Sequence, residues 1–97
     1  MNFGWEIIEE NRLEIISLCR KHGALNPHVF GSVARGTQRP DSDIDMLVEM
    51  DIGRTYTDLI RLQSALSSLL ELEVSVHTKN EIHEDILPRV SREAKAV

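Results

Sequence analysis

The chain of 97 residues has little cysteine, few aromatic side chains and no long apolar run. Its single cysteine, Cys19, excludes an intramolecular disulfide and a zinc site built from several thiolates, and it fits a reducing compartment. No apolar run approaches the roughly 20 residues of a membrane-spanning helix, and residues 1–6 lack the basic and apolar stretches of a signal peptide. We therefore expect a cytoplasmic protein without a membrane partner.

Basic residues are also scarce, because 11 lysines and arginines stand against 16 acidic residues and leave a formal net charge of −5. Binding to a nucleic-acid backbone depends on clustered positive charge, so direct nucleic-acid binding is disfavoured. An apolar fraction of 41% is typical of a folded globular domain. Since one core organises about 100 to 150 residues, we expect residues 1–97 to form a single domain.

Two stretches have the apolar spacing of amphipathic helices, residues 5–22 and residues 56–72. The second stretch is rich in leucine at intervals of three and four residues, and Thr55 or Thr57 can cap its start. Near the end of the chain, Asn80 is predicted to cap a short helix, and Pro88 either kinks that helix or opens a new turn. The C-terminal part is thus expected to be helical.

Three short segments are predicted to be strands, at residues 28–30, 43–50 and 73–78. Residues 32–42 between the first two contain glycine, proline and threonine, which indicates a loop with room for one helical turn at residues 33–35. Helices that alternate with strands in this order predict an α/β or α+β domain in which helices pack on a small sheet.

Two motifs with chemical meaning lie near each other on this predicted frame. Gly31 and Ser32 directly follow the first strand, where a glycine lets the backbone approach a phosphate and a serine offers a hydroxyl and an N–H. Asp43 and Asp45 lie at positions i and i+2 of the second strand, so both side chains point to one face. Two carboxylates on one face repel each other unless a cation or solvent separates them, and a pair of this kind suits a divalent metal.

The sequence GSVARG at 31–36, followed by SDIDMLV at 42–48, closely resembles the signature of minimal nucleotidyltransferases of the DNA polymerase beta superfamily. The resemblance extends over nearly the whole chain, because the leucine-rich helix and the third strand follow in the same order. It implies a nucleotidyltransferase-like fold with a small mixed β-sheet flanked by helices.

The resemblance also implies a site, a substrate and a partner. It assigns catalysis and Mg²⁺ binding to Asp43 and Asp45, with ATP as the substrate. The nucleotide-binding residues that it implies are Gly31, Ser32, Arg35 and Ser42. Proteins of this kind are commonly antitoxins that transfer AMP to a tyrosine of a HEPN-domain ribonuclease toxin, so a hetero-oligomer with such a toxin is implied. Arg35 has an equal alternative role as the partner of an acidic residue in a salt bridge.

One position departs from the family pattern. The third strand normally supplies a third carboxylate, and the matching residue here is Ser75. A neutral serine is a poor metal ligand and a poor base. Glu73 and His77 share a face with Ser75 by strand alternation, so either is a possible substitute.

Two functions therefore stay open at the level of the sequence. The first is a Mg²⁺-dependent protein adenylyltransferase. The second is a catalytically weakened domain of the same fold that neutralises a toxin by stoichiometric binding, and Ser75 favours this alternative. Nucleotidyl transfer to a small molecule is a weaker third idea, because it would require a further substrate-binding domain.

Overall fold

The computed structural model describes residues 5–36, 43–82 and 84–97. The helices and strands follow the chain in this order: α1 (Trp5–Glu10), α2 (Arg12–Lys21), β1 (Ala24–Phe30), α3 (Ser32–Arg35), β2 (Ile44–Met50), α4 (Tyr56–Leu70), β3 (Val74–Thr78), the 3-10 helix η1 (Lys79–Glu81), α5 (Leu87–Glu93) and β4 (Lys95–Ala96). Within these described ranges, every helix is too short or too polar to cross a membrane.

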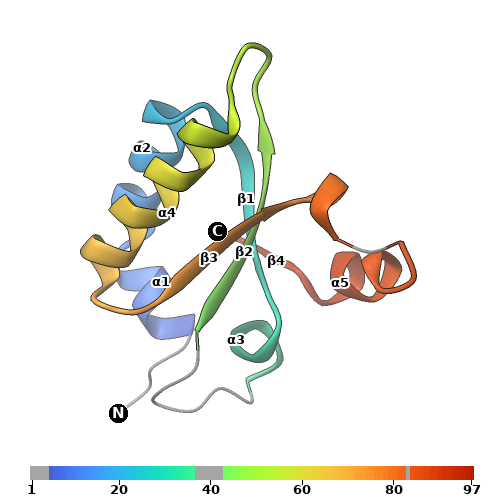
Figure 1. The fold of residues 1–97 in the computed structure, drawn as a ribbon. Helices are drawn as coiled ribbons and strands as arrows, with labels where there is room; N and C mark the ends of the chain where they lie inside the picture. Colours follow the sequence, from blue (N-terminus) through green and yellow to red (C-terminus); the bar gives the residue numbers. More distant parts are fainter. Residues whose placement is uncertain (1–4, 37–42, 83) are drawn as a thin grey trace.

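The four strands form one mixed sheet in the order β3-β2-β1-β4 (Figure 1). β1 runs antiparallel to both of its neighbours, whereas β2 and β3 run parallel and are joined through α4. The mixed sheet flanked by helices confirms the fold class predicted from the order of elements.

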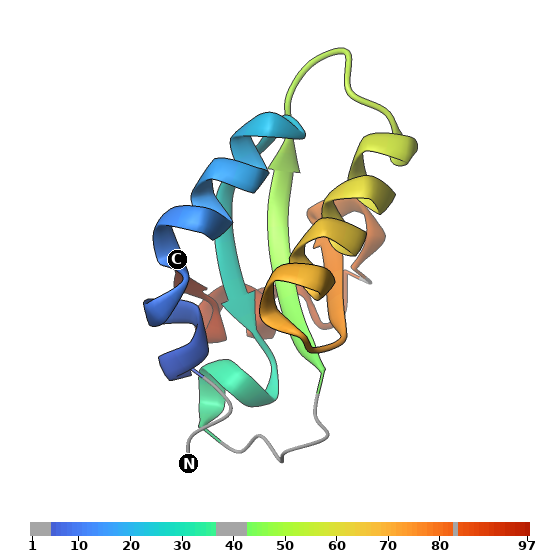
Figure 2. The same ribbon diagram turned by 90° about the vertical axis from the view of Figure 1, so that its left-hand side faces the viewer.

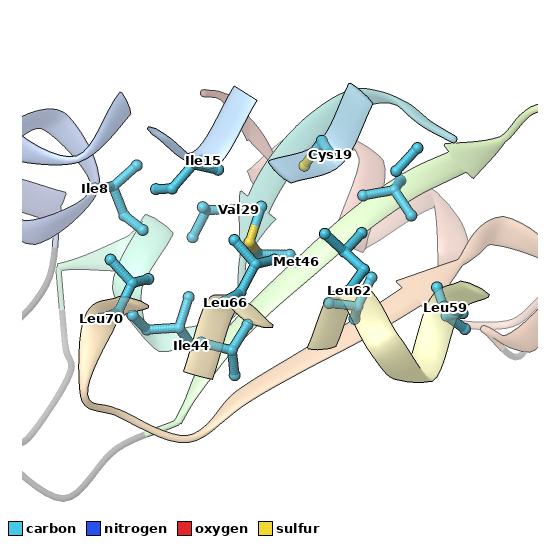
Figure 3. Packing of buried hydrophobic residues seen from close by; sticks show 14 of the residues in the cluster. Ile8, Ile15, Cys19, Val29, Ile44, Met46, Leu59, Leu62, Leu66 and Leu70 are labelled. Carbon is cyan, nitrogen blue, oxygen red and sulfur yellow. The ribbon is translucent and has the colours of Figure 1, made fainter. Parts of the chain in front are cut away.

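Helices α1, α2 and α4 cover one face of the sheet, which we call the helix-covered face (Figure 2). Apolar residues of the strands and helices meet there in one core, shown in Figure 3. Most of the strand residues predicted to be buried lie in this core: Val29, Ile44, Met46, Val48, Val74 and Val76. Phe30, predicted to be buried with them, is only half-buried, because it pairs with Asp45 on the other face of the sheet. Leu62 and Leu66 of α4 are completely buried against them.

α4 forms because its leucines follow the helical period and because its first turn is capped. The Asp58 carboxylate accepts a hydrogen bond of 2.8 Å from the backbone N–H of Thr55. After Leu70 the helix ends at Glu71, whose φ of 54° lies in the left-handed region. Two α4 side chains, Gln63 and Ser67, accept hydrogen bonds from backbone N–H groups of β3 and so occupy donors of an edge strand.

The N-terminal region differs from the prediction of one helix over residues 5–22. α1 and α2 are separated at Asn11, whose side chain donates a hydrogen bond of 2.9 Å to the carbonyl of Ile7. An asparagine competes for backbone partners in this way, and apolar spacing alone does not reveal the interruption.

The first strand was predicted too short, since β1 begins at Ala24 rather than at His28. Pro27 precedes the predicted segment, and proline is disfavoured within strands. Here the ladder between β1 and β2 is irregular between Leu25 and His28, and Asn26 has a φ of 50°. Such a bulge accommodates the proline within one continuous strand.

The C-terminal region also needs a correction. Asn80 lies inside η1 and does not cap a helix, whereas Pro88 is in the first turn of a separate helix, α5. Of the two alternatives for Pro88, the new turn is therefore the observed one. The two-residue strand β4, which pairs with β1, was not predicted, because a strand of two exposed residues has no alternation to detect.

Candidate active site

The opposite face of the sheet, which we call the site face, carries the polar residues of the predicted site. Asp45 of β2 pairs with Phe30 of β1 on one side and with Ser75 of β3 on the other. Paired residues of neighbouring strands point to the same face, so these three side chains form one row. The next row on this face contains His28, Leu47 and His77. Three segments distant in the sequence thus converge at Asp45.

Gly31 directly follows β1 and lies beside the carboxylate of Asp45. Its backbone has a φ of 75°, and a Cβ atom placed there would lie 2.9 Å from Oδ2 of Asp45. A side chain at this position would therefore be strained and would also crowd Asp45. The following residue, Ser32, is half-buried and starts α3. The glycine thus leaves the space next to Asp45 open on the side of β1.

The two aspartates differ in their surroundings. Asp43 directly precedes β2 and is exposed, whereas Asp45 is half-buried. Burial raises the pKa of Asp45 above its ordinary value; the positive charge of His77 acts against this, and the negative charge of Asp43 adds to it. The charged form of Asp45 is therefore incompletely compensated by the protein. A divalent cation between the two carboxylates would provide that compensation, so the residues present fit a metal.

Ser75 lies directly beside Asp45 in the parallel ladder, and it places a neutral hydroxyl there. Of the two possible substitutes, Glu73 is exposed and precedes β3. His77 is closer to the aspartate, since its Nε2 lies 3.8 Å from Oδ1 of Asp45. The other ring nitrogen, Nδ1, lies 3.9 Å from Oε2 of Glu81. The site face thus brings His77, and not Glu73, to the central aspartate.

Arg35 at the end of α3 forms a salt bridge with Glu93 of α5, with 3.0 Å between Nη1 and Oε2. Glu93 also accepts a hydrogen bond of 3.1 Å from Arg89, and the hydrogen bonds of the two arginines lower its pKa. Arg35 further contributes positive charge that lowers the pKa of Asp45. The predicted salt-bridge role of Arg35 is therefore observed, and its charge also reaches the site.

Some features of the site lay beyond the reach of sequence reasoning. Glu81 and Glu93 belong to no motif and approach the site only through the placement of η1 and α5. The remaining predicted nucleotide-binding residue, Ser42, lies outside the described residues.

In the described part of the chain, no three His, Cys, Asp or Glu side chains converge on one point. A metal held here would thus take part of its ligands from a substrate or from water, as Mg²⁺ commonly does.

The site face also contains a pocket of about 190 Å³. Its lining residues come from β1, β2, η1 and α5: Asn26, His28, Leu47, Val48, Glu49, Lys79, Ser91 and Ala94. Among the predicted site residues that the structure describes, none lines this pocket, but it adjoins them through the row of His28 and Leu47.

Residues 15–96 match the family model of the nucleotidyltransferase domain. The chain belongs to this nucleotidyltransferase family. The match spans both motifs and the third strand, and it confirms the family that the two motifs indicated. In this nucleotidyltransferase domain, the end of β1 and the start of β2 lie at the same end of the site face. Gly31, Ser32, Asp43 and Asp45 are therefore near one another there.

Relatives of this nucleotidyltransferase support the same assignment. A Methanocaldococcus jannaschii protein named as a candidate protein adenylyltransferase is 42% identical over 87 residues, which cover 90% of this chain and 94% of the relative. A solved structure described as a candidate minimal nucleotidyltransferase is 40% identical, has a TM-score of 0.87, and matches 100% of this chain and 97% of its own.

A second solved structure, a toxin–antitoxin complex with AMP-PNP, contains a chain similar to this nucleotidyltransferase. The identity is 26% and the TM-score is 0.74, over 89% of this chain and 71% of the other. This fold is thus shared with a chain of a toxin–antitoxin complex that was crystallised with a nucleotide analogue.

Proposed function

We propose that this nucleotidyltransferase is the antitoxin of a toxin–antitoxin pair and that it transfers AMP from ATP to a tyrosine of a HEPN ribonuclease toxin. The observation that carries the proposal is the position of Asp45, which lies between Gly31 and Ser75 at the end of the site face where β1 terminates. The name of the Methanocaldococcus jannaschii relative supports adenylyl transfer to a protein. The toxin–antitoxin complex with AMP-PNP supports the toxin and the nucleotide.

Asp43 and Asp45 would hold a divalent cation, Mg²⁺ in the simplest case. When bound, the cation would draw charge from the triphosphate oxygens and so favour departure of pyrophosphate. Asp45 is suited to this role because its carboxylate is half-buried and lacks full compensation from protein groups. Asp43 is suited because it is exposed and adjacent on the same face.

The phosphates would bind beside Gly31 and Ser32. The absence of a side chain at Gly31 lets phosphate oxygens come close to Asp45, and the Ser32 hydroxyl and N–H are donors for them. Arg35, and Ser42 in the connection to β2, are proposed to contribute further donors to the nucleotide. A triphosphate held in this way would present its α-phosphate to an incoming hydroxyl.

In the proposed reaction the tyrosine oxygen attacks the α-phosphorus in line with the leaving group. A bond forms between that oxygen and the α-phosphorus, the bond from the α-phosphorus to the bridging oxygen breaks, and pyrophosphate leaves. The tyrosine proton passes to water, because Ser75 offers no basic group beside Asp45. The protein contributes mainly by positioning the reactants.

The negative net charge of the chain is compatible with a basic protein partner. A ribonuclease toxin must present a basic surface to RNA, and a net charge of −5 would be attracted to such a surface. We therefore propose that residues 1–97 form a single nucleotidyltransferase domain, and that this domain assembles with the toxin into a hetero-oligomer in the cytoplasm.

A second function is favoured by one specific observation, the neutral Ser75 in the row of Asp45. In this alternative the domain has weakened catalysis and inhibits the toxin by covering its ribonuclease site. Stoichiometry distinguishes the two functions, because a catalyst acts below one equivalent and its effect outlasts its removal, whereas a bound inhibitor follows occupancy.

The test is incubation of the chain with labelled ATP, Mg²⁺ and a co-purified HEPN partner, followed by intact mass measurement of both proteins. Adenylyl transfer predicts a mass increase of one or more AMP groups on the partner at substoichiometric amounts of this chain. Neutralisation at one-to-one stoichiometry without a mass change would exclude the enzymatic proposal in favour of the binding one.

Ser75→Asp sharpens this test. A carboxylate next to Asp45 would offer both a metal ligand and a base, so we expect AMP transfer with Mg²⁺ to rise by about tenfold or more. Ser64→Asp on the exposed side of α4 is the matched control, since it adds the same charge away from the site. An equal rate in wild type and Ser75→Asp would mean that another group already supplies the function of the missing carboxylate.

A further inference from the structure

The pocket of about 190 Å³ on the site face has no role in the proposed function so far. It begins one row beyond Asp45, because the next row along β2 contains Leu47, which lines the pocket together with His28 of β1. Successive residues on one face of a strand are about 7 Å apart. The pocket therefore lies about one side-chain position away from the proposed site of AMP transfer.

The floor of the pocket is apolar. Leu47 points to the site face and is only 6% exposed, although it lies outside the core of the helix-covered face. Helix α5 lies on the same side of the sheet as the pocket (Figure 1), and Ala94 at its end adds a methyl group to the lining. An apolar side chain that entered the pocket would be removed from water against these groups.

The rim of the pocket is polar and carries both charges. The Glu49 carboxylate accepts a hydrogen bond of 3.1 Å from the side chain of Asn26 and has lone pairs left for further donors. Lys79 of η1 is exposed and brings an ammonium group that donates. An extended peptide needs partners for both its N–H and its C=O groups when it is buried. The rim is therefore suited to a peptide main chain above an apolar side chain.

The size of the pocket separates the possible occupants. Pockets that enclose a whole small ligand measure about 300 to 1,000 Å³. A volume of about 190 Å³ holds one side chain and is too small to enclose a nucleoside. In an extended segment, side chains two residues apart point to the same side and are about 7 Å apart. A segment whose tyrosine reaches Asp45 thus places the second residue along at the pocket.

Resting on the proposed function, we propose that the pocket recognises the acceptor segment of the toxin by binding an apolar side chain two residues from the tyrosine. Glu49 accepts a hydrogen bond from a main-chain N–H of that segment, and Lys79 donates one to a main-chain carbonyl. The sequence around the tyrosine, and not the tyrosine alone, then decides whether AMP is transferred.

The first experiment fills the pocket and separates the KM for the partner from kcat. Ser91 is an exposed residue of α5 that lines the pocket, so Ser91→Trp fills it without altering a strand. AMP transfer to the co-purified HEPN partner is measured at saturating ATP and Mg²⁺. We expect the KM for the partner to rise by about tenfold or more, with kcat changed by less than about twofold.

Ser64→Trp is the matched control, because it adds the same ring at an exposed serine of α4, on the other side of the sheet. It should leave both kinetic constants unchanged, and circular dichroism verifies that both variants are folded. Calorimetry with ATP and Mg²⁺ should give equal affinities for wild type and Ser91→Trp. A weaker ATP affinity in Ser91→Trp would assign the pocket to the nucleotide, and an unchanged KM for the partner would refute acceptor recognition.

The second experiment does not depend on AMP transfer. Since Cys19 is buried, a short photoreactive maleimide should label Ser91→Cys at position 91, and Ser64→Cys at position 64 in the control. Each labelled chain is illuminated with the HEPN partner and α,β-methylene ATP, an analogue whose α–β bond is not cleaved. Mass spectrometry should find the label of position 91, but not that of position 64, attached beside a tyrosine of the partner.

The two experiments distinguish failure of the pocket from failure of the proposed function. If AMP is transferred but the label of position 91 attaches elsewhere than beside the modified tyrosine, only the assignment of the pocket fails. If the label attaches beside a tyrosine and no AMP is transferred by the wild type, the proposed enzymatic function fails, while the pocket keeps its role in binding that segment.

Discussion

The two faces of one sheet have opposite properties. On the helix-covered face, Ile44 and Met46 of β2 are completely buried under the helices (Figures 2 and 3). On the site face, Asp45 lies between them in sequence and is half-buried beside a glycine with positive φ. Because successive side chains of a strand point to opposite faces, Ile44 and Met46 pack in the core while Asp45 between them faces the candidate site.

Two aspartates illustrate the contrast, because their pKa values are shifted in opposite directions. Asp58, in the first turn of α4, accepts a backbone hydrogen bond from Thr55, which lowers its pKa. Asp45 has a raised pKa, chiefly because of burial. The ionised form of Asp58 therefore stabilises the fold, and the ionised form of Asp45 costs stability. The site face thus retains a carboxylate, that of Asp45, whose ionised form lowers the stability of the fold.

The largest expected effect lies on the helix-covered face. Leu66→Ala should lower the free energy of unfolding by about 2 to 5 kcal/mol, because Leu66 is completely buried in the core. Chemical denaturation measures this loss. Leu13→Ala is the matched control at a leucine that is 80% exposed, and we expect a change within about 0.5 kcal/mol there. Similar losses in both variants would contradict the described core.

Asp45→Asn should have the opposite effect on stability and a large effect on activity. We expect AMP transfer to fall by at least about a hundredfold, since a metal ligand is lost. Without metal, the melting temperature at neutral pH should rise by a few degrees, because an amide is buried in place of a charge.

The pH dependence of that gain tests its cause. A carboxyl with a raised pKa destabilises the fold only where it is ionised, so the advantage of Asp45→Asn should shrink as the pH falls through the raised pKa and should vanish below the ordinary pKa of aspartate. Asp51→Asn in the exposed turn after β2 serves as the control. A melting temperature lowered by Asp45→Asn in metal-free buffer would refute the assigned cost of this carboxylate.

A smaller effect is expected at Arg35, which forms a salt bridge and is also a proposed nucleotide-binding residue. Arg35→Met and Glu93→Gln each break the same exposed salt bridge, so both should lower the melting temperature only slightly. If Arg35 also binds the triphosphate, only Arg35→Met should weaken ATP affinity, by about tenfold, as measured by calorimetric titration. Equal ATP affinities in the two variants would leave Arg35 with the structural role alone.

The smallest effect concerns Asp58. Asp58→Asn removes a charge that accepts the Thr55 hydrogen bond, so a loss of a degree or two in melting temperature is expected near neutral pH. Since the pKa of Asp58 is lowered, its contribution is complete above the ordinary pKa and disappears as the pH falls through the lowered value. Melting curves between pH 3 and pH 7 check the sign, which is opposite to that of Asp45.

The motifs and the main helix could be predicted because their signals are local. Gly31, Asp43 and Asp45 are adjacent to strands whose apolar alternation is clear, and the leucines of α4 follow one helical period. The interruption at Asn11 and the bulge before His28 could not be predicted, because a side-chain hydrogen bond and a ladder irregularity leave no mark on apolar spacing.

The sequence by itself determined that two aspartates share a face and that a nucleotidyltransferase family pattern is present, and the resemblance to that family is what implies a third carboxylate at the position of Ser75. Only the tertiary structure decided that His77 rather than Glu73 reaches Asp45, and that Glu81 and Glu93 approach the site. Strand alternation is a local rule that assigns a face to each side chain. Proximity across strands depends on register and on the placement of η1 and α5, which are set by packing between distant segments.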